Sequence, residues 1–495
     1  MLVGVDLTRD NAESIPQQIS DFADVFSQDA LTFGVSPGVE MVFPPLNGPL
    51  PPPARPIRLS PEQQVVEAQQ TAENIRLGRN VPSTSSTASF FFVRKHCKEC
   101  HQLRCTCGAR AYENRGVIDY RPLNSITPQD AYPLPDMDDL RSTAAGHRWY
   151  TKIDIWSDFN LIPVAERDRH LTAFLSPSAG LLEWTVMPFG LKNAPAVFQR
   201  FVDSTLSPCQ KFSRASLDDI LVWADSEQEM WDRVCAVLLR MRAAGLRAKL
   251  HKCRFLVPEV DYLGRILSAA GIAPDPAKAR GIRDVAAPRT KTEVRAFLGL
   301  LSYYREFVPN FVELALPLYA LTRDDQPATV AWTNACQLNF DQLKNSFSRD
   351  AQLAVYDPSL PAELITGAST QAFAGVIRQA GRPLSRFSGK FFSTQQNWST
   401  TDRELYACVY AHQKYAYMLM GDTHWYTDHE ALTSLRTTLA NSARRARWRE
   451  ILDRFPFTVN YMKGADMVKF GVDPLTRHSS WGSEVHEEAP PVDEW

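Results

Sequence analysis

Three aspartates are the residues whose type and spacing best suit catalysis. Asp154 ends a strand-like segment, and Asp218 and Asp219 are adjacent within the apolar stretch ASLDDILVW. Neighbouring carboxylates repel one another, so holding them between buried strands needs a positive counter-charge. Mg²⁺ binds one or two carboxylates together with phosphate oxygens, and three aspartates on neighbouring strands could hold two such ions. The plain alternative is a surface turn, where Asp-Asp pairs are common.

A cysteine cluster is the second group with chemical potential. Four of the nine cysteines lie within eleven residues, and the odd total excludes a secreted disulfide framework. Thiolates at such spacings can share one tetrahedral Zn²⁺, which would staple the tip of a hairpin. Four reduced thiols in an insertion are the alternative. The candidate zinc ligands are Cys97, Cys100, Cys105 and Cys107.

The elements that must position these residues mix strands and helices without strict alternation, which predicts an α+β fold with α/β portions. Periodicity and capping signals place helices at about 60–78, 226–244, 290–308, 402–419 and 444–455. Strands are predicted at about 89–95, 115–124, 152–155, 215–223, 361–378 and 424–427, with turns inside 215–223 and 361–378.

Composition limits the class of protein. The 495 residues carry 54 Lys and Arg against 56 Asp and Glu, and this near-balance excludes a histone-like polycation. Basic residues nevertheless concentrate in two runs, 240–254 and 444–449, although such runs are usually solvated faces. No secretory signal or membrane-length apolar run is visible, which predicts an intracellular protein with no membrane partner.

Several long motifs occur in a fixed order along the chain. They are VIDYRPLNSIT, DAYPLPDMDDL, KIDIWSDFNLIPVAERDRHLTAF, EWTVMPFGLKNAPAVFQRF, ASLDDILVW and VDYLGRILSAAGI. In this order they resemble the reverse transcriptase and ribonuclease H region of gypsy-class long-terminal-repeat retrotransposon Pol polyproteins, over about residues 59–478. The resemblance implies a right-hand polymerase of fingers, palm and thumb, followed by a connection and a ribonuclease H-like α/β domain.

The resemblance also assigns roles in the polymerase. Asp154, Asp218 and Asp219 match the catalytic triad that binds two Mg²⁺ ions. Either Lys249 or Lys252 matches the lysine near the pyrophosphate, and 262–264 matches the turn that grips the primer. Four residues match positions that contact the incoming nucleotide, namely Arg115, Phe159, Phe189 and Gly190.

Two departures fall near the first constellation. The family usually has an aromatic residue two positions before the Asp pair, and this chain has Ser216, which removes a ring from the primer end. Asp158 and Asn160 replace a Gly and a His, and Asp158 adds negative charge. Both changes predict weakened polymerase chemistry.

Residues 361–478 resemble the ribonuclease H domain that follows the polymerase. Glu404, Asp428 and Asp473 match its catalytic carboxylates, although Thr401 and Glu404 also form a capping-box pattern. The family places an Asp where this chain has Gly367. Glu363 is about 13 Å further along the strand, too far to substitute. We therefore expect a folded domain with little or no nuclease activity.

Two functions remain open from the sequence. One is an RNA-directed DNA polymerase whose partners are an RNA template, a DNA primer, their hybrid and dNTPs. The other is a decayed or co-opted copy that binds the hybrid without catalysis, and a stand-alone nuclease conflicts with Gly367. No protease motif or integrase-like region is visible, so we expect a fragment of the usual polyprotein or a truncated copy.

The motifs predict a domain order. A short, weakly structured arm with a proline-rich linker is expected first and an acidic disordered tail last, with a cysteine-rich insertion at 96–110. The predicted parts are the arm and linker (1–58), fingers and palm (59–265), thumb (266–330), connection (331–360), ribonuclease H-like domain (361–478) and tail (479–495).

Overall fold

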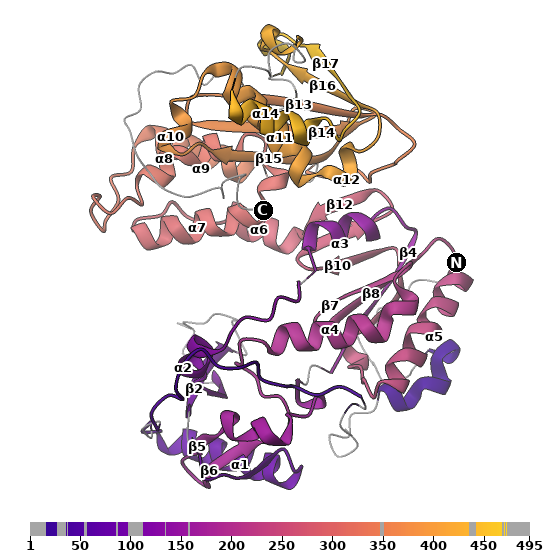
Figure 1. The fold of residues 1–495 in the computed structure, drawn as a ribbon, viewed down its shortest axis with the longest axis vertical. Coiled ribbons are helices and arrows are strands. Elements are labelled where there is room, and N and C mark those ends of the chain that lie inside the picture. The colour runs from indigo at the N-terminus through magenta and orange to yellow at the C-terminus, as the bar shows by residue number, and fades with distance from the viewer. Residues whose placement is uncertain are drawn as a thin grey trace. The chain divides into compact units, whose positions relative to one another are not determined.

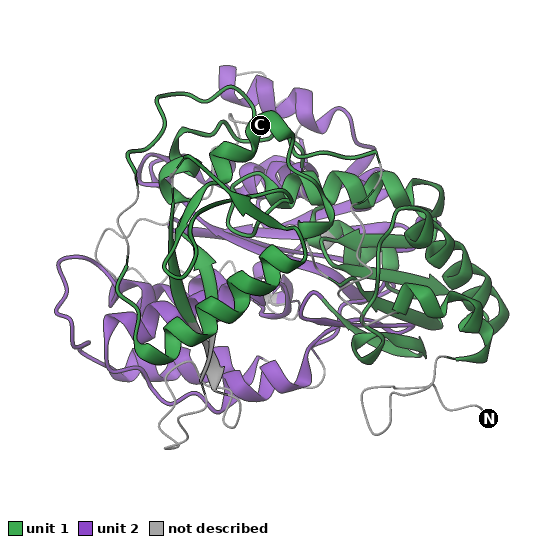
Figure 2. Cartoon of the chain, turned by 90° about the horizontal axis from the view of Figure 1, so that it is seen from below, with its two compact units in different colours: residues 1–262 green, residues 263–495 purple. Residues whose placement is uncertain are grey.

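The computed structural model describes residues 16–26, 36, 38–53, 57–85, 88–97, 112–133, 135–156, 159–346, 351–434, 442–467, 470 and 472. The chain divides into two compact units, residues 1–262 and 263–495 (Figure 2). Each unit is described by itself.

A five-stranded sheet forms one part of the first unit. Its strand order is β1-β6-β5-β2-β3, and β2 and β3 form the predicted hairpin. Helix α1 begins after Ser60, as its capping serine predicts, and the structure adds a capping box in which Ser60 and Gln63 satisfy each other's backbone N–H groups. The elements are α1 (Pro61–Arg76), β1 (Asn80–Pro82), β2 (Ala88–Cys97), β3 (Tyr112–Ile118), β5 (Phe174–Ser176) and β6 (Gly180–Trp184).

A four-stranded sheet of order β7-β8-β4-β9 carries the three aspartates. Helices α4 and α5 pack against it and against each other (Figure 1). The α5 residues predicted from their spacing, Met230, Val234, Val237, Leu238 and Met241, are all fully buried. The elements are α2 (Arg121–Ile126), α3 (Met137–Ala144), β4 (Trp149–Asp154), α4 (Ala194–Leu206), β7 (Ser213–Ser216), β8 (Asp219–Ala224), α5 (Glu227–Ala243), β9 (Arg254–Val257) and β10 (Glu259–Tyr262).

The segment before the proline-rich linker differs from the expected weakly structured arm. Residues 17–26 form the 3-10 helix η1 (Gln17–Phe26), which buries Ile19, Phe22, Val25 and Phe26. These side chains belong to the same core as β4, β8 and α5. Their spacing of three and four buries one apolar face, a signal that the proline-rich stretch downstream obscured.

The second unit begins with a hairpin and a group of helices. Strands β11 (Arg265–Ser268) and β12 (Gly271–Pro274) pair antiparallel. Thr290 caps α7 by accepting the Glu293 N–H, as the sequence predicted. The helices, which share one apolar core, are α6 (Pro276–Arg283), α7 (Lys291–Tyr303), α8 (Phe311–Ala320) and α9 (Asn334–Asn345).

A five-stranded mixed sheet completes the second unit, in the order β15-β14-β13-β16-β17. The first three strands are antiparallel, whereas β16 runs parallel to β13 and to β17. Helix α11 packs on β13 and β14, and α14 packs on α11. The elements are β13 (Ala362–Ala368), β14 (Ala372–Gln379), β15 (Arg382–Lys390), α10 (Ser393–Gln396), α11 (Thr400–Lys414), α12 (Ala416–Leu419), β16 (Thr423–Thr427), α14 (Ala443–Leu452), β17 (Phe457–Tyr461) and α15 (Gly464–Met467).

The mixture of helices and mostly antiparallel sheets confirms the predicted α+β class. Across the described residues, none of the helices combines the length and apolar character that crossing a bilayer requires.

Candidate active site

The structure brings the three predicted aspartates together at one end of the four-stranded sheet. Asp154 and Asp219 are directly opposite each other across β4 and β8, and Asp218 lies in the turn that precedes β8. Residues directly opposite in an antiparallel pair have Cβ atoms about 5 Å apart, and like charges there repel. The site therefore needs positive charge.

A buried glutamine holds the turn that carries Asp218. Leu217 has φ of 53°, the left-handed conformation that a two-residue hairpin turn requires. Its N–H donates to Gln199 Oε1 at 2.8 Å, and Gln199 Nε2 donates to the Ala215 carbonyl at 3.1 Å. The Asp218 carbonyl accepts the Ile155 N–H at 2.7 Å. Helix α4 thus fixes the turn against β4.

Two half-buried lysines supply the positive charge. Lys152 Nζ lies 3.2 Å from Asp219 Oδ2, and Lys249 Nζ lies 3.1 Å from Asp154 Oδ1. Burial is the largest influence on Asp219 and raises its pKa, Lys152 opposes this shift, and the charges of Asp218 and Asp154 add to it. The carboxylate pair is therefore only partly compensated.

Lys249 and Lys252, which the sequence left as alternatives, both lie near Asp154 but in different settings. Lys249 is 16% exposed, and its backbone N–H also donates to the Asp154 carbonyl at 2.9 Å. Lys252 is 53% exposed and its Nζ is 3.8 Å from Asp154 Oδ2. Lys249 is thus part of the packed site, whereas Lys252 is oriented toward solvent.

The aspartates offer the oxygen donors that Mg²⁺ prefers, and Mg²⁺ typically takes only one or two carboxylates beside substrate phosphates. Among the described residues, however, no three His, Cys, Asp or Glu side chains form a complete metal-binding group. Asp154 and Asp219 have lysines as partners instead. The donor types therefore suit Mg²⁺, while Lys152 and Lys249 engage two of the carboxylate oxygens.

The residues predicted to contact the nucleotide lie on neighbouring elements. The Phe159 ring is 4.9 Å from the Phe189 ring, centroid to centroid, and Gly190 has φ of 96°. Asn124 fixes this turn, because its Nδ2 donates to the Gly190 carbonyl and its Oδ1 accepts the Lys192 N–H, both at 2.8 Å. The RPLN motif (121–124) and the PFGLKN motif (188–193) are therefore joined by direct hydrogen bonds.

Part of the prediction falls outside the described residues. This applies to Asp158, Cys100, Cys105 and Cys107, and to the side chains of Cys97 and Arg115. The zinc site and the triphosphate contact of Arg115 remain predictions.

The second unit brings two of its predicted carboxylates near each other. Glu404 is 2% exposed, its Oε1 accepts the Ala368 N–H at 2.7 Å, and its Oε2 has no hydrogen-bond partner. Burial, reinforced by the nearby charge of Asp428, raises the pKa of Glu404 well above its ordinary value. Asp473 lies outside the described residues.

Gly367 occupies the position on β13 where the family has an aspartate. It is in register with Ala374 on β14, which is in register with Ser388 on β15. Helix α8 covers this part of the sheet, where the Val312 N–H donates to Ser388 Oγ at 3.4 Å. Glu363 pairs with Arg378 at 2.5 Å, so its carboxylate is engaged elsewhere.

The arginine run at 444–449 serves both packing and surface roles. Trp448, the aromatic residue within this run, is buried in the domain core. Arg445 forms an ion pair with Asp402 at 2.7 Å, and the Arg444 guanidinium lies 4.3 Å from the Trp398 ring centre. Only part of the run is therefore available to phosphate.

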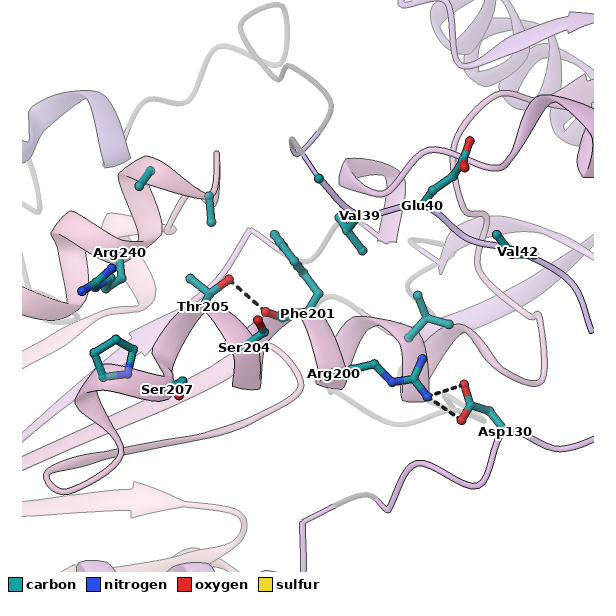
Figure 3. Close-up of a pocket in the computed structure, with 15 residues that line it drawn as sticks. Val39, Glu40, Val42, Asp130, Arg200, Phe201, Ser204, Thr205, Ser207 and Arg240 are labelled. Atoms are coloured by element: carbon teal, nitrogen blue, oxygen red, sulfur yellow. Dashed lines mark hydrogen bonds and ion pairs between the residues drawn. The ribbon is translucent and has the colours of Figure 1, made fainter.

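A separate hollow of about 890 Å³ lies in the first unit between residues 38–42, α4 and the end of α5 (Figure 3). An ion pair of 2.6 Å between Arg200 and Asp130 lies at its edge. None of the predicted site residues lines it, so the candidate chemistry is elsewhere.

Sequence reasoning missed three positioning residues: Lys152, Gln199 and Asn124. Lys152 had a readable signal, because residues two apart on a strand point to the same face and Lys152 precedes Asp154 by two. Gln199 and Asn124 lie inside recognised motifs, but their partners are more than 15 residues away in sequence. Only the tertiary fold shows these contacts.

Two family models match the chain. Residues 111–267 match "Reverse transcriptase (RNA-dependent DNA polymerase)", and residues 332–425 match "RNase H-like domain found in reverse transcriptase". Among solved structures, the foamy viral protease-reverse transcriptase in complex with RNA/DNA hybrid superposes with a TM-score of 0.76 at 20% identity. That match covers 95% of this chain and 62% of the other, and it supports the fold.

Curated relatives agree with these matches. The chain is 35% identical over 361 residues to the Pol polyprotein from transposon 297 of Drosophila melanogaster, covering 72% of this chain and 34% of the relative. It is 32% identical over 388 residues to the gypsy Pol polyprotein of the same organism, covering 75% and 37%. The chain thus spans about a third of these relatives' length. It belongs to the reverse transcriptase and ribonuclease H region of the retrotransposon Pol polyproteins.

Proposed function

We propose that the chain is an RNA-directed DNA polymerase of a long-terminal-repeat retrotransposon, with a ribonuclease H-like domain that has little or no nuclease activity. The observation that carries the polymerase proposal is the cross-strand pair of Asp154 and Asp219 with Asp218 in the adjoining turn. The substrates would be a primer 3′-hydroxyl and dNTPs on an RNA template. One foamy viral relative of similar fold was solved with an RNA/DNA hybrid, which is consistent with such a partner.

The three aspartates would hold two Mg²⁺ ions, which when bound activate the primer hydroxyl and neutralise the leaving pyrophosphate. The chain's own residues would hold the aspartates and the nucleotide in position. Gln199 holds the turn of Asp218, and Asn124 holds the turn of Gly190, against which the nucleotide would lie. The ring of Phe159, packed on Phe189, would form the floor beneath the sugar. Exposed Lys252 remains available to phosphate oxygens.

Primer extension on an RNA template with Mg²⁺ tests the polymerase. We expect incorporation that falls by at least about a thousandfold in Asp218→Asn, because a lost metal ligand removes several kcal/mol of transition-state stabilisation. Asp225→Asn is a matched control, since Asp225 lies beyond the end of β8 and its carboxylate pairs with His147. Equal activity in Asp218→Asn and the unaltered chain would refute the assignment.

The nuclease half of the proposal depends on Gly367 and on the environment of Glu404. Without a carboxylate at 367, and with Glu404 favouring its neutral form, the domain lacks two of the charges that would attract metal. We expect a labelled RNA–DNA hybrid with Mg²⁺ to remain uncut. Cleavage that Asp428→Asn abolishes would overturn this.

A second function is a hybrid-binding protein without catalysis, which Ser216 and Gly367 favour. Ser216 is buried beside the catalytic turn, where it pairs with Asp219 across β7 and β8. Tight hybrid binding with no extension by the unaltered chain would establish this alternative.

A further inference from the structure

The two lysines beside the aspartates occupy the atoms that a metal would need. Lys152 Nζ contacts Asp219 Oδ2 at 3.2 Å and Lys249 Nζ contacts Asp154 Oδ1 at 3.1 Å. Asp218, the third aspartate, has no ion pair with a basic side chain in the described part of the chain. Three carboxylates therefore face two packed lysines, and the exposed Lys252 lies further away, with its Nζ 3.8 Å from Asp154 Oδ2.

Each lysine is held by further contacts of its own. Lys249 Nζ is 3.4 Å from the Ile155 carbonyl and 5.6 Å from the centre of the Trp156 ring. Lys152 Nζ is 3.5 Å from the Asp261 carbonyl. These carbonyls give each ammonium group a second set of acceptors when its carboxylate contact is lost.

A divalent ion at Asp154 and Asp219 competes with the lysines in two ways. It needs the same carboxylate oxygens, and it is repelled by two ammonium groups within a few ångströms.

We propose that Lys152 and Lys249 act as resident counter-ions, which stabilise the metal-free site and set how much Mg²⁺ is needed to fill it. This inference rests on the proposed polymerase function. In the metal-free protein the lysines offset the repulsion between Asp154 and Asp219. On metal binding each lysine gives up its carboxylate oxygen and keeps its carbonyl partners.

The test uses the full chain with Mn²⁺ as a spectroscopic probe, counted by electron paramagnetic resonance. Lys152→Met keeps the length of the side chain and removes its charge, and we expect Mn²⁺ to bind at least about tenfold tighter. Thermal unfolding in EDTA should occur about 2 to 4 °C lower than in the unaltered chain, and saturating Mg²⁺ should remove this deficit. Lys152→Arg, which keeps the charge, should restore the unaltered behaviour.

Lys344→Met is the matched control, because Lys344 Nζ donates to the Val285 carbonyl at 2.7 Å in the second unit. It should leave Mn²⁺ affinity unchanged. Lys249→Met provides an independent second variant with the same expected result as Lys152→Met. Unchanged or weaker Mn²⁺ affinity in both variants, or a melting deficit that Mg²⁺ does not reduce, overturns the inference alone. Mn²⁺ binding to the unaltered chain should be lost in Asp218→Asn. If the unaltered chain binds no Mn²⁺, or if Asp218→Asn binds it equally well, the proposed function fails as well.

Discussion

At the scale of single residues, the chain has all three aspartates predicted for a polymerase site and a glycine, Gly367, where a nuclease carboxylate was expected. Asp154 and Asp219 have lysine partners at hydrogen-bonding distance, so their charges are partly offset within the fold. Buried Glu404 accepts one hydrogen bond, from the Ala368 N–H to its Oε1, and its Oε2 has no hydrogen-bond partner. A buried carboxylate in such surroundings favours its neutral form. The two sites therefore differ in charge compensation as well as in residue type.

Glu404→Gln should stabilise the second unit at neutral pH. Glutamine keeps an oxygen that accepts the Ala368 N–H and removes a charge that burial disfavours, so the expected gain is about 1 kcal/mol or more. The pKa of Glu404 is raised in the folded chain, so its contribution is present at low pH and lost as pH rises through that raised pKa. Melting temperatures of both proteins across pH measure this difference, which should disappear in acid. A loss of stability in Glu404→Gln, equal to that in Glu404→Ala, would contradict it.

At the scale of elements, each site depends on contacts between segments far apart in sequence. Helix α4 reaches the turn of Leu217 and Asp218 through Gln199, and α2 reaches the turn of Gly190 through Asn124. Helix α11 reaches β13 through Glu404. Because one side chain of the helix is hydrogen-bonded to the turn, a shift of the helix also shifts the residues of the turn.

Gln199→Leu should weaken the catalytic turn. It leaves the buried Leu217 N–H without an acceptor, at a cost of about 1 to 3 kcal/mol. Primer extension should fall more than tenfold while the circular dichroism spectrum stays unchanged. Gln199→Glu is the control for geometry, because it keeps the acceptor for Leu217 and loses the donor to the Ala215 carbonyl. It should retain more activity than Gln199→Leu, and the reverse order would exclude this role.

His412 makes α11 sensitive to acid. Its Nδ1–H donates to the Cys408 carbonyl at 2.9 Å, its Nε2 has no partner, and the rings of Phe455 and Phe457 lie within 5.1 Å, centroid to centroid. Burial lowers the pKa of His412 to about 4, against about 6.5 in an unfolded chain. The contribution of neutral His412 to the free energy of unfolding is therefore complete above pH 6.5. It is lost as pH falls toward 4, by at most about 3 kcal/mol.

Hydrogen exchange of the 400–414 peptide in the full chain measures this effect. Protection should fall between pH 6.5 and 4, after correction for intrinsic exchange. His412→Leu should flatten the dependence, since leucine has no proton to bind. A slope that is the same in both proteins would assign the acid sensitivity to other groups.

At the scale of the whole molecule, the fold was more predictable than the environment of the sites. The helices starting at Ser60, Ser226 and Thr290 follow their capping signals, because a cap is a local interaction. The turn of Asp218 and Asp219 was also readable from its apolar flanks. Lys152 and Lys249 were not recognised as counter-ions, since each contact joins strands or loops whose separation only the folded chain defines.

The largest difference concerns η1, which was expected to be a loose arm. It buries four apolar side chains, and its Asp24 pairs with Arg242, whose guanidinium lies 4.5 Å from the centre of the Phe22 ring. The Val25 carbonyl accepts the Ala248 N–H at 2.9 Å, one residue before Lys249. The helix therefore supports the segment, between α5 and β9, that carries Lys249.

Deleting residues 1–26 should unfold or strongly destabilise the first unit. Each buried apolar side chain contributes about 1.5 to 3 kcal/mol, so losing four removes an amount comparable with the stability of a domain. Hydrogen exchange in α5 should increase, whereas exchange in α11 of the second unit should not change. Arg242→Met, which removes only the ion pair with Asp24, should increase exchange in α5 by a smaller amount. Full protection of α5 after the deletion would contradict the role of η1.

The position of η1 also has a consequence for the order of folding. Asp24 and Arg242 are 218 residues apart, so the helix emerges from the ribosome long before its partner is made. At a synthesis rate of about 5 to 20 residues per second, the four apolar side chains stay without their α5 partner for at least about ten seconds. During synthesis the first segment of the unit is therefore one of the last to be buried, and for that interval it is a natural target for chaperones.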